Sequence, residues 1–174
     1  MFGQLDSVEL RTGITLAGVL SFRMLGLFMI LPVFMLLAAD MPGFTPARAG
    51  LAVGIYGLTQ AALQQPFGWL SDRFGRRRIM VTGLALFATG GVVAAMAETM
   101  GMLIAGRALQ GCGAIAGVAL AFAADHTRAQ YRSVVMAIIG MSIGASFLLS
   151  MMISVPLSTL LLSLIHISEP TRLC

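Results

Sequence analysis

A short charged segment between two long apolar stretches carries most of the chemistry in this sequence. From residue 68 to 78 the chain reads Gly-Trp-Leu-Ser-Asp-Arg-Phe-Gly-Arg-Arg-Arg, with one acid and four arginines. A carboxylate such as Asp72 can cap the start of a facing helix, where the helix dipole places partial positive charge. Gly75 permits a tight reversal, and Gly68 permits a neighbouring helix to approach closely. The segment therefore predicts a charged turn against which a second element docks.

A second polar pattern lies inside an apolar stretch. Arg107, Gln110, Gly111 and Ala114 fall at i, i+3, i+4 and i+7, so they share one helix face. A guanidinium at membrane depth costs at least ~2.5 kcal/mol, so Arg107 is expected to face the bundle or water and to have a partner. It is interpreted as a functional group of a central cavity, with a purely structural, paired arginine as the alternative.

Three further polar side chains are expected at depth. Arg23 lies within the first apolar stretch and either contacts substrate or a coupling ion, or snorkels or pairs structurally. Gln60 and Gln64 are four residues apart and share a helix face. They either line a cavity or form hydrogen bonds between helices.

The elements that position these residues are long apolar segments. With 58% apolar residues, 10% charged residues and a mean hydropathy of +0.93, the chain has too little polar surface for a soluble globule. A helix needs about 20 apolar residues to cross the hydrocarbon core. After a polar N-terminus at 1–11, the sequence predicts five helical spans, at about 12–39, 49–71, 79–97, 99–124 and 133–160.

The distribution of arginine predicts the orientation, because short cytoplasmic loops keep an excess of positive charge. The loops that follow the first and third spans hold a single arginine, Arg48. Both arginine-rich loops and the N-terminus are therefore expected in the cytoplasm. The net charge of +4 reflects this topology, and without a basic stripe interleaved with aromatics no nucleic acid is expected as a partner. The two loops that follow the second and fourth spans hold Arg73, Arg76, Arg77, Arg78, Arg128 and Arg132.

The residues offer little support for catalysis. The sequence has no nucleophile–base pair, no metal-ligand spacing and no glycine-rich phosphate loop after a strand. No enzyme activity, catalytic residue, metal or cofactor is therefore expected. An integral membrane scaffold or receptor is the remaining alternative of another class, but it gives no reason for arginines in mid-span.

The spans also lack an acid or histidine at mid-depth, although a proton carrier usually needs a titratable group there. Three explanations stay open: the carrier lies in a missing part, Asp72 or Asp125 serves from the rim, or coupling is to something else. His126, beside Asp125, is interpreted as a solvated residue, with pH sensing as the lesser alternative.

The C-terminal segment is set apart from the fold. Residues 162–172 read Leu-Ser-Leu-Ile-His-Ile-Ser-Glu-Pro-Thr-Arg, which resembles the in-frame translation of a transposase adapter used in sequencing libraries. The alternative is a natural helix end. Residues 162–174 are therefore predicted to be an artefact, and the genuine sequence to stop near Leu161.

The charged turn resembles the signature of the major facilitator superfamily, Gly-x-x-x-Asp-Arg-x-Gly-Arg-Arg. The resemblance implies a conformational latch that holds the outward-facing state. Asp72 and Arg76 would be the latch pair and Gly68 the contact point, with the docking helix in a second half-bundle outside this chain. The matching residues are Gly68, Asp72, Arg73, Gly75, Arg76 and Arg77.

Further strings narrow the resemblance. Ser21–Gly26, Gly54–Gln60, Gly68–Arg73 and Gly106–Gly111 are similar to bacterial drug:proton antiporters of the YajR type. In the superfamily the arginine that corresponds to Arg107 is implicated in proton coupling. One departure is that the exporter signature of the fifth helix, Gly-x-x-x-Gly-Pro-x-x-Gly-Gly, is absent.

The sequence thus predicts an all-α membrane protein: five transmembrane helices of the N-terminal six-helix half-bundle of a twelve-helix major facilitator fold. The parent protein is expected to export small organic or drug-like molecules in exchange for protons by alternating access. An uptake or metabolite symporter of the same superfamily is the alternative. The expected partners are the lipid bilayer, protons, a small-molecule substrate and the missing C-terminal half. The expected location is the bacterial cytoplasmic (inner) membrane.

Overall fold

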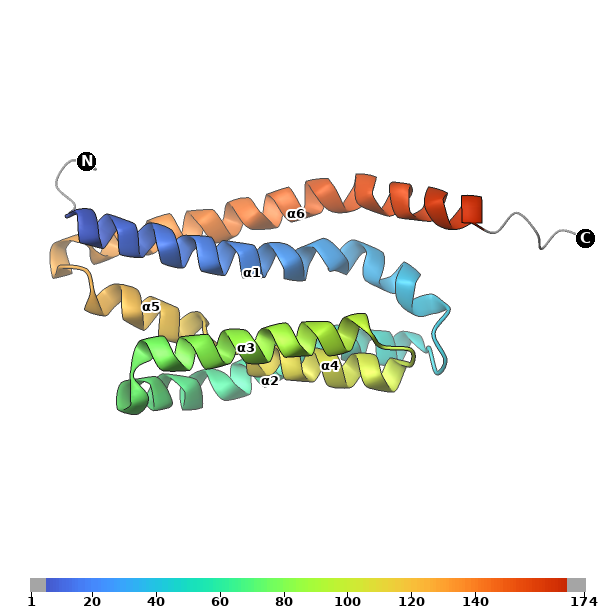
Figure 1. The fold of residues 1–174 in the computed structure, drawn as a ribbon, viewed down its shortest axis with the longest axis horizontal. Coiled ribbons are helices and arrows are strands. Elements are labelled where there is room, and N and C mark those ends of the chain that lie inside the picture. The colour runs from blue at the N-terminus through green and yellow to red at the C-terminus, as the bar shows by residue number, and fades with distance from the viewer. Residues whose placement is uncertain (1–5, 169–174) are drawn as a thin grey trace, which may run out of the picture.

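The computed structural model describes residues 6–168, which form long helices joined by short turns (Figure 1). This part of the chain contains no strand. The elements are α1 (Ser7–Ala39), α2 (Pro46–Phe74), α3 (Arg76–Ala95), α4 (Met100–Cys112), α5 (Ala116–Asp125), a 3-10 turn (Ala129–Tyr131) and α6 (Arg132–Ser168). The prediction of an all-helical membrane protein is confirmed.

The helix boundaries follow from local capping chemistry. Thr45 caps α2 by accepting a hydrogen bond from the backbone N–H of Arg48 at 3.2 Å, and Thr99 caps α4 in the same way. Gly75 separates α2 from α3 with a φ of 94°, a left-handed conformation that side chains with a Cβ rarely adopt. The reversal predicted for the charged segment is therefore built on this glycine.

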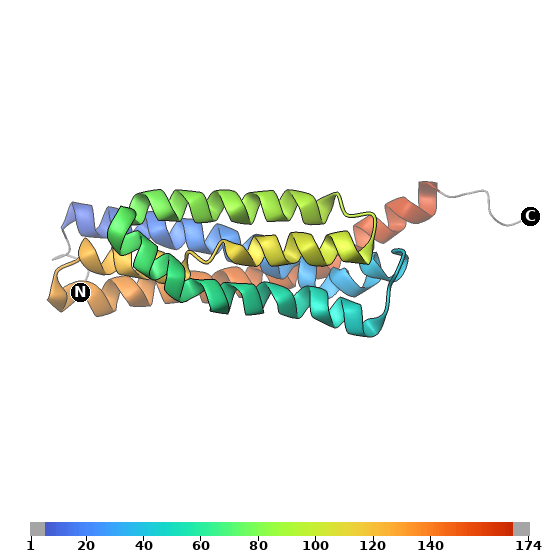
Figure 2. The ribbon, with the colours of Figure 1, turned by 90° about the horizontal axis from the view of Figure 1, so that it is seen from below.

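The helices lie in two layers. α1 and α6 run side by side, α2, α3 and α4 form the second layer, and α5 joins the two at one end (Figures 1 and 2). Ser150 and Ser154 of α6 link the first layer by donating hydrogen bonds to the carbonyls of Leu25 and Met29 of α1, at 3.1 and 3.0 Å. In the second layer, glycine allows close packing, since a Cβ on Gly106 would meet the backbone of Ala94.

The fourth predicted span is broken rather than continuous. The sequence predicts one helix over 99–124, whereas Gly113, Ala114 and Ile115 separate α4 from α5. Gly113 has φ −74° and ψ 53°, outside the helical region. A side chain there would collide with the carbonyl of Gly83 and with Phe87 on α3. The break thus lies at a place where α3 packs closely against the chain.

Four segments of the described chain are long and apolar enough to cross a membrane: Ser7–Met29, Arg76–Ala95, Met100–Asp125 and Ala129–Ser154. α2 has the length but not the hydropathy, because Gln60, Gln64 and Gln65 interrupt its apolar run. Large apolar side chains such as Phe22, Met141 and Met152 are exposed on the outside of the bundle. Such a surface suits lipid rather than water.

The turns alternate between the two ends of the bundle. The start of α1, the α2–α3 turn and the α5–α6 turn lie at one end, and the α1–α2 and α3–α4 turns lie at the other (Figure 1). The six loop arginines named above thus share one end. α6 continues to Ser168, and residues 169–174 lie outside the described residues, so the adapter origin of 162–174 stays a prediction.

Candidate functional site

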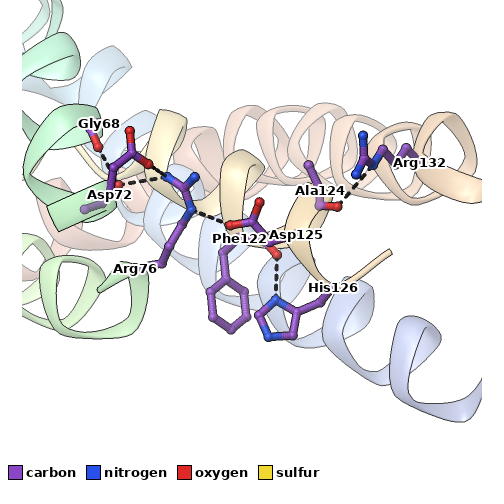
Figure 3. Close-up of polar contacts among 9 residues, drawn as sticks. Gly68, Asp72, Arg76, Phe122, Ala124, Asp125, His126 and Arg132 are labelled. Atoms are coloured by element: carbon purple, nitrogen blue, oxygen red, sulfur yellow. Dashed lines mark hydrogen bonds and ion pairs between the residues drawn. The ribbon is translucent and has the colours of Figure 1, made fainter. Parts of the chain in front are cut away.

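Arg76, the first residue of α3, joins the charged turn to the end of α5. Its Nη1 lies 2.7 Å from Oδ1 of Asp72 on α2, and its Nε lies 2.6 Å from Oδ2 of Asp125 on α5 (Figure 3). One guanidinium thus bridges two carboxylates that are 53 positions apart in the sequence. Such charge-assisted contacts are directional, because the planar fork fixes where each acid lies.

The backbone around the charged turn supports this bridge. Arg76 Nη1 also donates to Ser71 Oγ at 2.9 Å, and that hydroxyl donates to the carbonyl of Gly68 at 2.6 Å (Figure 3). Ser71 is buried, so the network anchors Arg76 to the last turns of α2. The positive φ of Gly75 then turns the chain so that Arg76 points back to α2.

The other signature residues remain at the surface. Arg73 lies over the rings of Trp69 and Phe74, at 5.8 and 5.9 Å from their centroids, and Arg77 is exposed. A Cβ on Gly68 would meet nothing within 4 Å. Among residues 6–168, the face of α2 at Gly68 is therefore open.

A third ion pair, between Arg128 and Glu9, lies at the same end of the bundle. Glu9, in the first turn of α1, accepts hydrogen bonds from the backbone N–H, Nε and Nη2 of Arg128 at 2.9, 2.9 and 2.8 Å. These bonds raise the pKa of the Arg128 guanidinium above its usual range. His126 nearby is exposed, stacks on Phe122 and contacts its carbonyl oxygen through Nδ1 at 2.9 Å (Figure 3).

Arg107 lies in the middle of the second layer and is only 4% exposed. Its Nη1 donates to Gln110 Oε1 at 2.8 Å, its Nε donates to the carbonyl of Ala52 at 3.4 Å, and its guanidinium lies 5.1 Å from the ring centroid of Tyr56. Arg107 and Gln110 therefore lie on the same face of α4. Gly111 has a packing role, because a Cβ there would collide with Thr59 and the carbonyl of Tyr56.

Arg23 of α1 reaches across to the second layer and is 2% exposed. Its Nη2 donates to Tyr56 Oη at 3.0 Å and to Gln60 Oε1 at 3.2 Å, and its guanidinium lies 4.9 Å from the ring centroid of Phe87. Its Nε and Nη1 are buried and have no hydrogen-bond partner among the described residues. An unpaired buried donor costs about 1–3 kcal/mol, and more when it is charged.

Gln60 and Gln64, which the sequence places on one helix face, have different surroundings in the structure. Gln60 is half-buried and bonds to Arg23 between helices, whereas Gln64 is exposed, and its Cγ would lie 3.5 Å from a Cβ on Gly117 of α5. A cavity of about 320 Å³ lies between α1 and the α3–α4 pair. Arg107 and Gln110 supply its strongly polar side chains, and it is otherwise lined by Gly26, Phe34, Ala38, Met41, Gly91, Ala94, Ala95 and Leu103.

Sequence reasoning missed four residues that complete these contacts. Tyr56 is four positions before Gln60 on α2, and that spacing was the available signal. The sequence suggests Asp125 as a proton carrier at the rim, but nothing in it indicates the contact with Arg76. Glu9 and Arg128 are 119 positions apart, and a sequence pattern does not reveal such a pairing.

Together these features define a multi-pass helical membrane protein with buried polar groups beside an internal cavity. A family model described as Major Facilitator Superfamily matches residues 16–168. The chain is 50% identical over 138 residues to the "Inner membrane transport protein YajR" of Escherichia coli (strain K12), covering 79% of this chain and 30% of that protein.

Two other relatives show the same relationship. The chain is 41% identical over 154 residues to an "Uncharacterized transporter" of Buchnera aphidicola subsp. Schizaphis graminum, covering 88% of this chain and 39% of that protein. Over 71 residues it is 39% identical to a "Putative multidrug resistance protein MdtD" of Cronobacter sakazakii, covering 41% of this chain and 15% of that protein. The chain belongs to the Major Facilitator Superfamily, whose members here are transporters rather than enzymes. It spans about a third of the length of the first two relatives.

Proposed function

We propose that this chain is the N-terminal part of a secondary transporter that exports small organic or drug-like molecules in exchange for protons. The observation that carries the proposal is the cavity between α1 and the α3–α4 pair. Its wall is apolar apart from Arg107 and Gln110, which suits an amphipathic ligand. The name of the MdtD relative also favours drug export.

The proposed mechanism is alternating access between two half-bundles, with substrate held near the midplane. In this mechanism the charged turn is the latch, formed by Asp72, Arg76 and Asp125, and the open face at Gly68 receives a helix of the missing C-terminal half. The end that holds the six loop arginines faces the bacterial cytoplasm. Arg73 and Arg77 would hold the turn at the headgroup level.

The acids that this proposal assigns to proton coupling lie at the rim of the bundle. Asp72 and Asp125 both contact Arg76, so protonation of either would weaken its contact with the guanidinium. Loss of the bridge would release the end of α5 from the charged turn.

The test measures proton movement in proteoliposomes that hold the complete transporter and a trapped pH indicator. Addition of norfloxacin, chloramphenicol or ethidium should move protons against the drug, and Arg107→Ala should slow this exchange at least about tenfold, or about 1.4 kcal/mol. Arg11→Gln is the control, because Arg11 is exposed at the end of α1. Proton movement in the same direction as the substrate would instead identify a symporter. A complete lack of flux with every drug would refute the export proposal.

A further inference from the structure

A shallow hollow lies between the charged turn and the end of α5, beside the proposed latch. Its volume is about 480 Å³. Arg77 and Arg78 line it from the first turn of α3, and both residues are exposed. The remaining lining residues are Phe74, Gly75, Arg76, Phe122 and His126, and Figure 3 draws the last three.

The positive charge of this hollow is only partly compensated. Arg76 pairs with two acids, Asp72 and Asp125. Among residues 6–168, no acid forms an ion pair with Arg77 or Arg78. Two neighbouring guanidinium groups on an exposed surface attract anions, so the hollow has the charge to receive one.

The hollow lies where the membrane-spanning segments begin and end. The candidate span Arg76–Ala95 begins at its edge, and the candidate span Met100–Asp125 ends there. Trp69 and Phe74 on the neighbouring turns of α2 are 61% and 54% exposed. Aromatic rings concentrate at the boundary between membrane and water. The hollow therefore lies at the level of the lipid headgroups.

Its walls offer the two kinds of contact that a phospholipid needs. Guanidinium groups bind phosphate oxygens through paired hydrogen bonds. The rings of Phe74 and Phe122 give an apolar surface for the part of the lipid that joins the phosphate to the acyl chains. His126 contacts the carbonyl oxygen of Phe122 through Nδ1, so Nε2 is the ring nitrogen that remains for a ligand. A free anion would use the arginines but not the rings.

We propose that this hollow binds the headgroup phosphate of an anionic phospholipid through Arg77 and Arg78. A headgroup with a net negative charge is favoured over a zwitterionic one, because its charge is not cancelled by an ammonium group beside the arginines. The proposal does not depend on drug export or on proton coupling. It depends on the charge of the hollow and on its level in the membrane.

The first arm measures lipid binding to the complete protein in detergent by native mass spectrometry, without drug or pH gradient. Phosphatidylglycerol is the probe, and phosphatidylcholine with the same acyl chains is its control. Phosphatidylglycerol should bind at least about fivefold more tightly. Arg77→Gln and Arg78→Gln should each weaken its binding about fivefold, and neither should change the binding of phosphatidylcholine.

A variant with unchanged total charge separates a site from general attraction to a basic surface. Arg78→Gln combined with Gln130→Arg moves one positive charge out of the hollow but keeps it at the same end of the bundle. Gln130 is exposed and is not among the lining residues. The combined variant should bind phosphatidylglycerol as weakly as Arg78→Gln alone. Recovery of the wild-type affinity would mean diffuse attraction, and the proposal would be overturned.

The second arm tests a free anion in place of the lipid, by the thermal unfolding midpoint of the delipidated protein. Phosphatidylglycerol should raise the midpoint, less so in the Arg77→Gln, Arg78→Gln double variant, and inorganic phosphate should leave it unchanged. A rise with phosphate alone that needs the two arginines would identify a free-anion site and refute the lipid proposal. Equal binding of the two lipids to the wild type would refute it even if the variants fold poorly, and export would remain possible.

Discussion

Arg128 closes around the carboxylate of Glu9 with its backbone N–H and two of its guanidinium nitrogens, at 2.8 to 2.9 Å. The carboxylate also accepts the backbone N–H of Asp6 at 3.0 Å, so it caps α1 while it holds the α5–α6 turn. The Glu9 side chain is 6% exposed and that of Arg128 is 53% exposed. Because the two side chains differ in exposure, removing Glu9 and removing Arg128 are expected to lower the stability by different amounts.

Arg128→Gln is expected to lower the thermal unfolding midpoint more than Glu9→Gln. The first change leaves a buried carboxylate with fewer partners, whereas the second leaves a guanidinium that water can solvate. The double variant should lose less than the sum of the two, because both changes break the same contact. Arg11→Gln, two positions after Glu9 and exposed, is the control and should change little. Equal effects of the two single changes would contradict this account.

Gly111→Ala is expected to destabilise the α2–α4 contact by about 1–3 kcal/mol, the usual cost of overpacking. The added methyl group would fall on Thr59 and on the carbonyl of Tyr56. Gly57→Ala on α2 is the matched control, because a Cβ there meets nothing within 4 Å. The control should be neutral or stabilising by up to about 1 kcal/mol, since alanine favours helix. Thermal unfolding of the complete protein in detergent measures both, and equal loss would show that packing at Gly111 is not tight.

The orientation of the bundle can be tested with single cysteines in a background where Cys112 and Cys174 are serine. A maleimide that does not cross membranes should label Asp40→Cys in intact cells, but it should label Gln130→Cys only after the cells are opened. Both residues are exposed and lie in turns at opposite ends of the bundle. The reverse pattern would place the six loop arginines outside, against the positive-inside rule.

Much of this fold follows from composition and spacing. Long apolar runs form helices in a membrane. The chain reversal predicted at Gly75 is present, and it uses the positive φ of that glycine. The shared face of Arg107 and Gln110 also follows from helical periodicity. These features depend on residues that are near one another in the sequence.

What the sequence did not supply depends on tertiary contacts. The break at Gly113 lies where α3 occupies the space beside the chain, and no local pattern specifies that neighbour. The Arg76–Asp125 contact similarly joins residues 49 positions apart. The family resemblance implies a partner for Asp72 and Arg76 outside this chain, whereas Arg76 already contacts a second acid within it. Pairings at such separations require the arrangement of α3 against α5.

The proposed latch makes a prediction for the open face at Gly68. If a helix of the other half covers this face in the latched state, Gly68→Cys should react slowly with a maleimide in the wild-type background. Asp72→Asn and Asp125→Asn should each speed the reaction by up to about fivefold, because each removes a partly exposed ion pair worth about 0.2–1 kcal/mol. The double variant should be labelled faster than either single variant, since Arg76 uses different nitrogens for the two acids. Gln130→Cys is the control for general accessibility and should react at one rate in all backgrounds. Fast labelling of Gly68→Cys with both acids intact would mean that nothing docks on this face, and the latch would have to be abandoned.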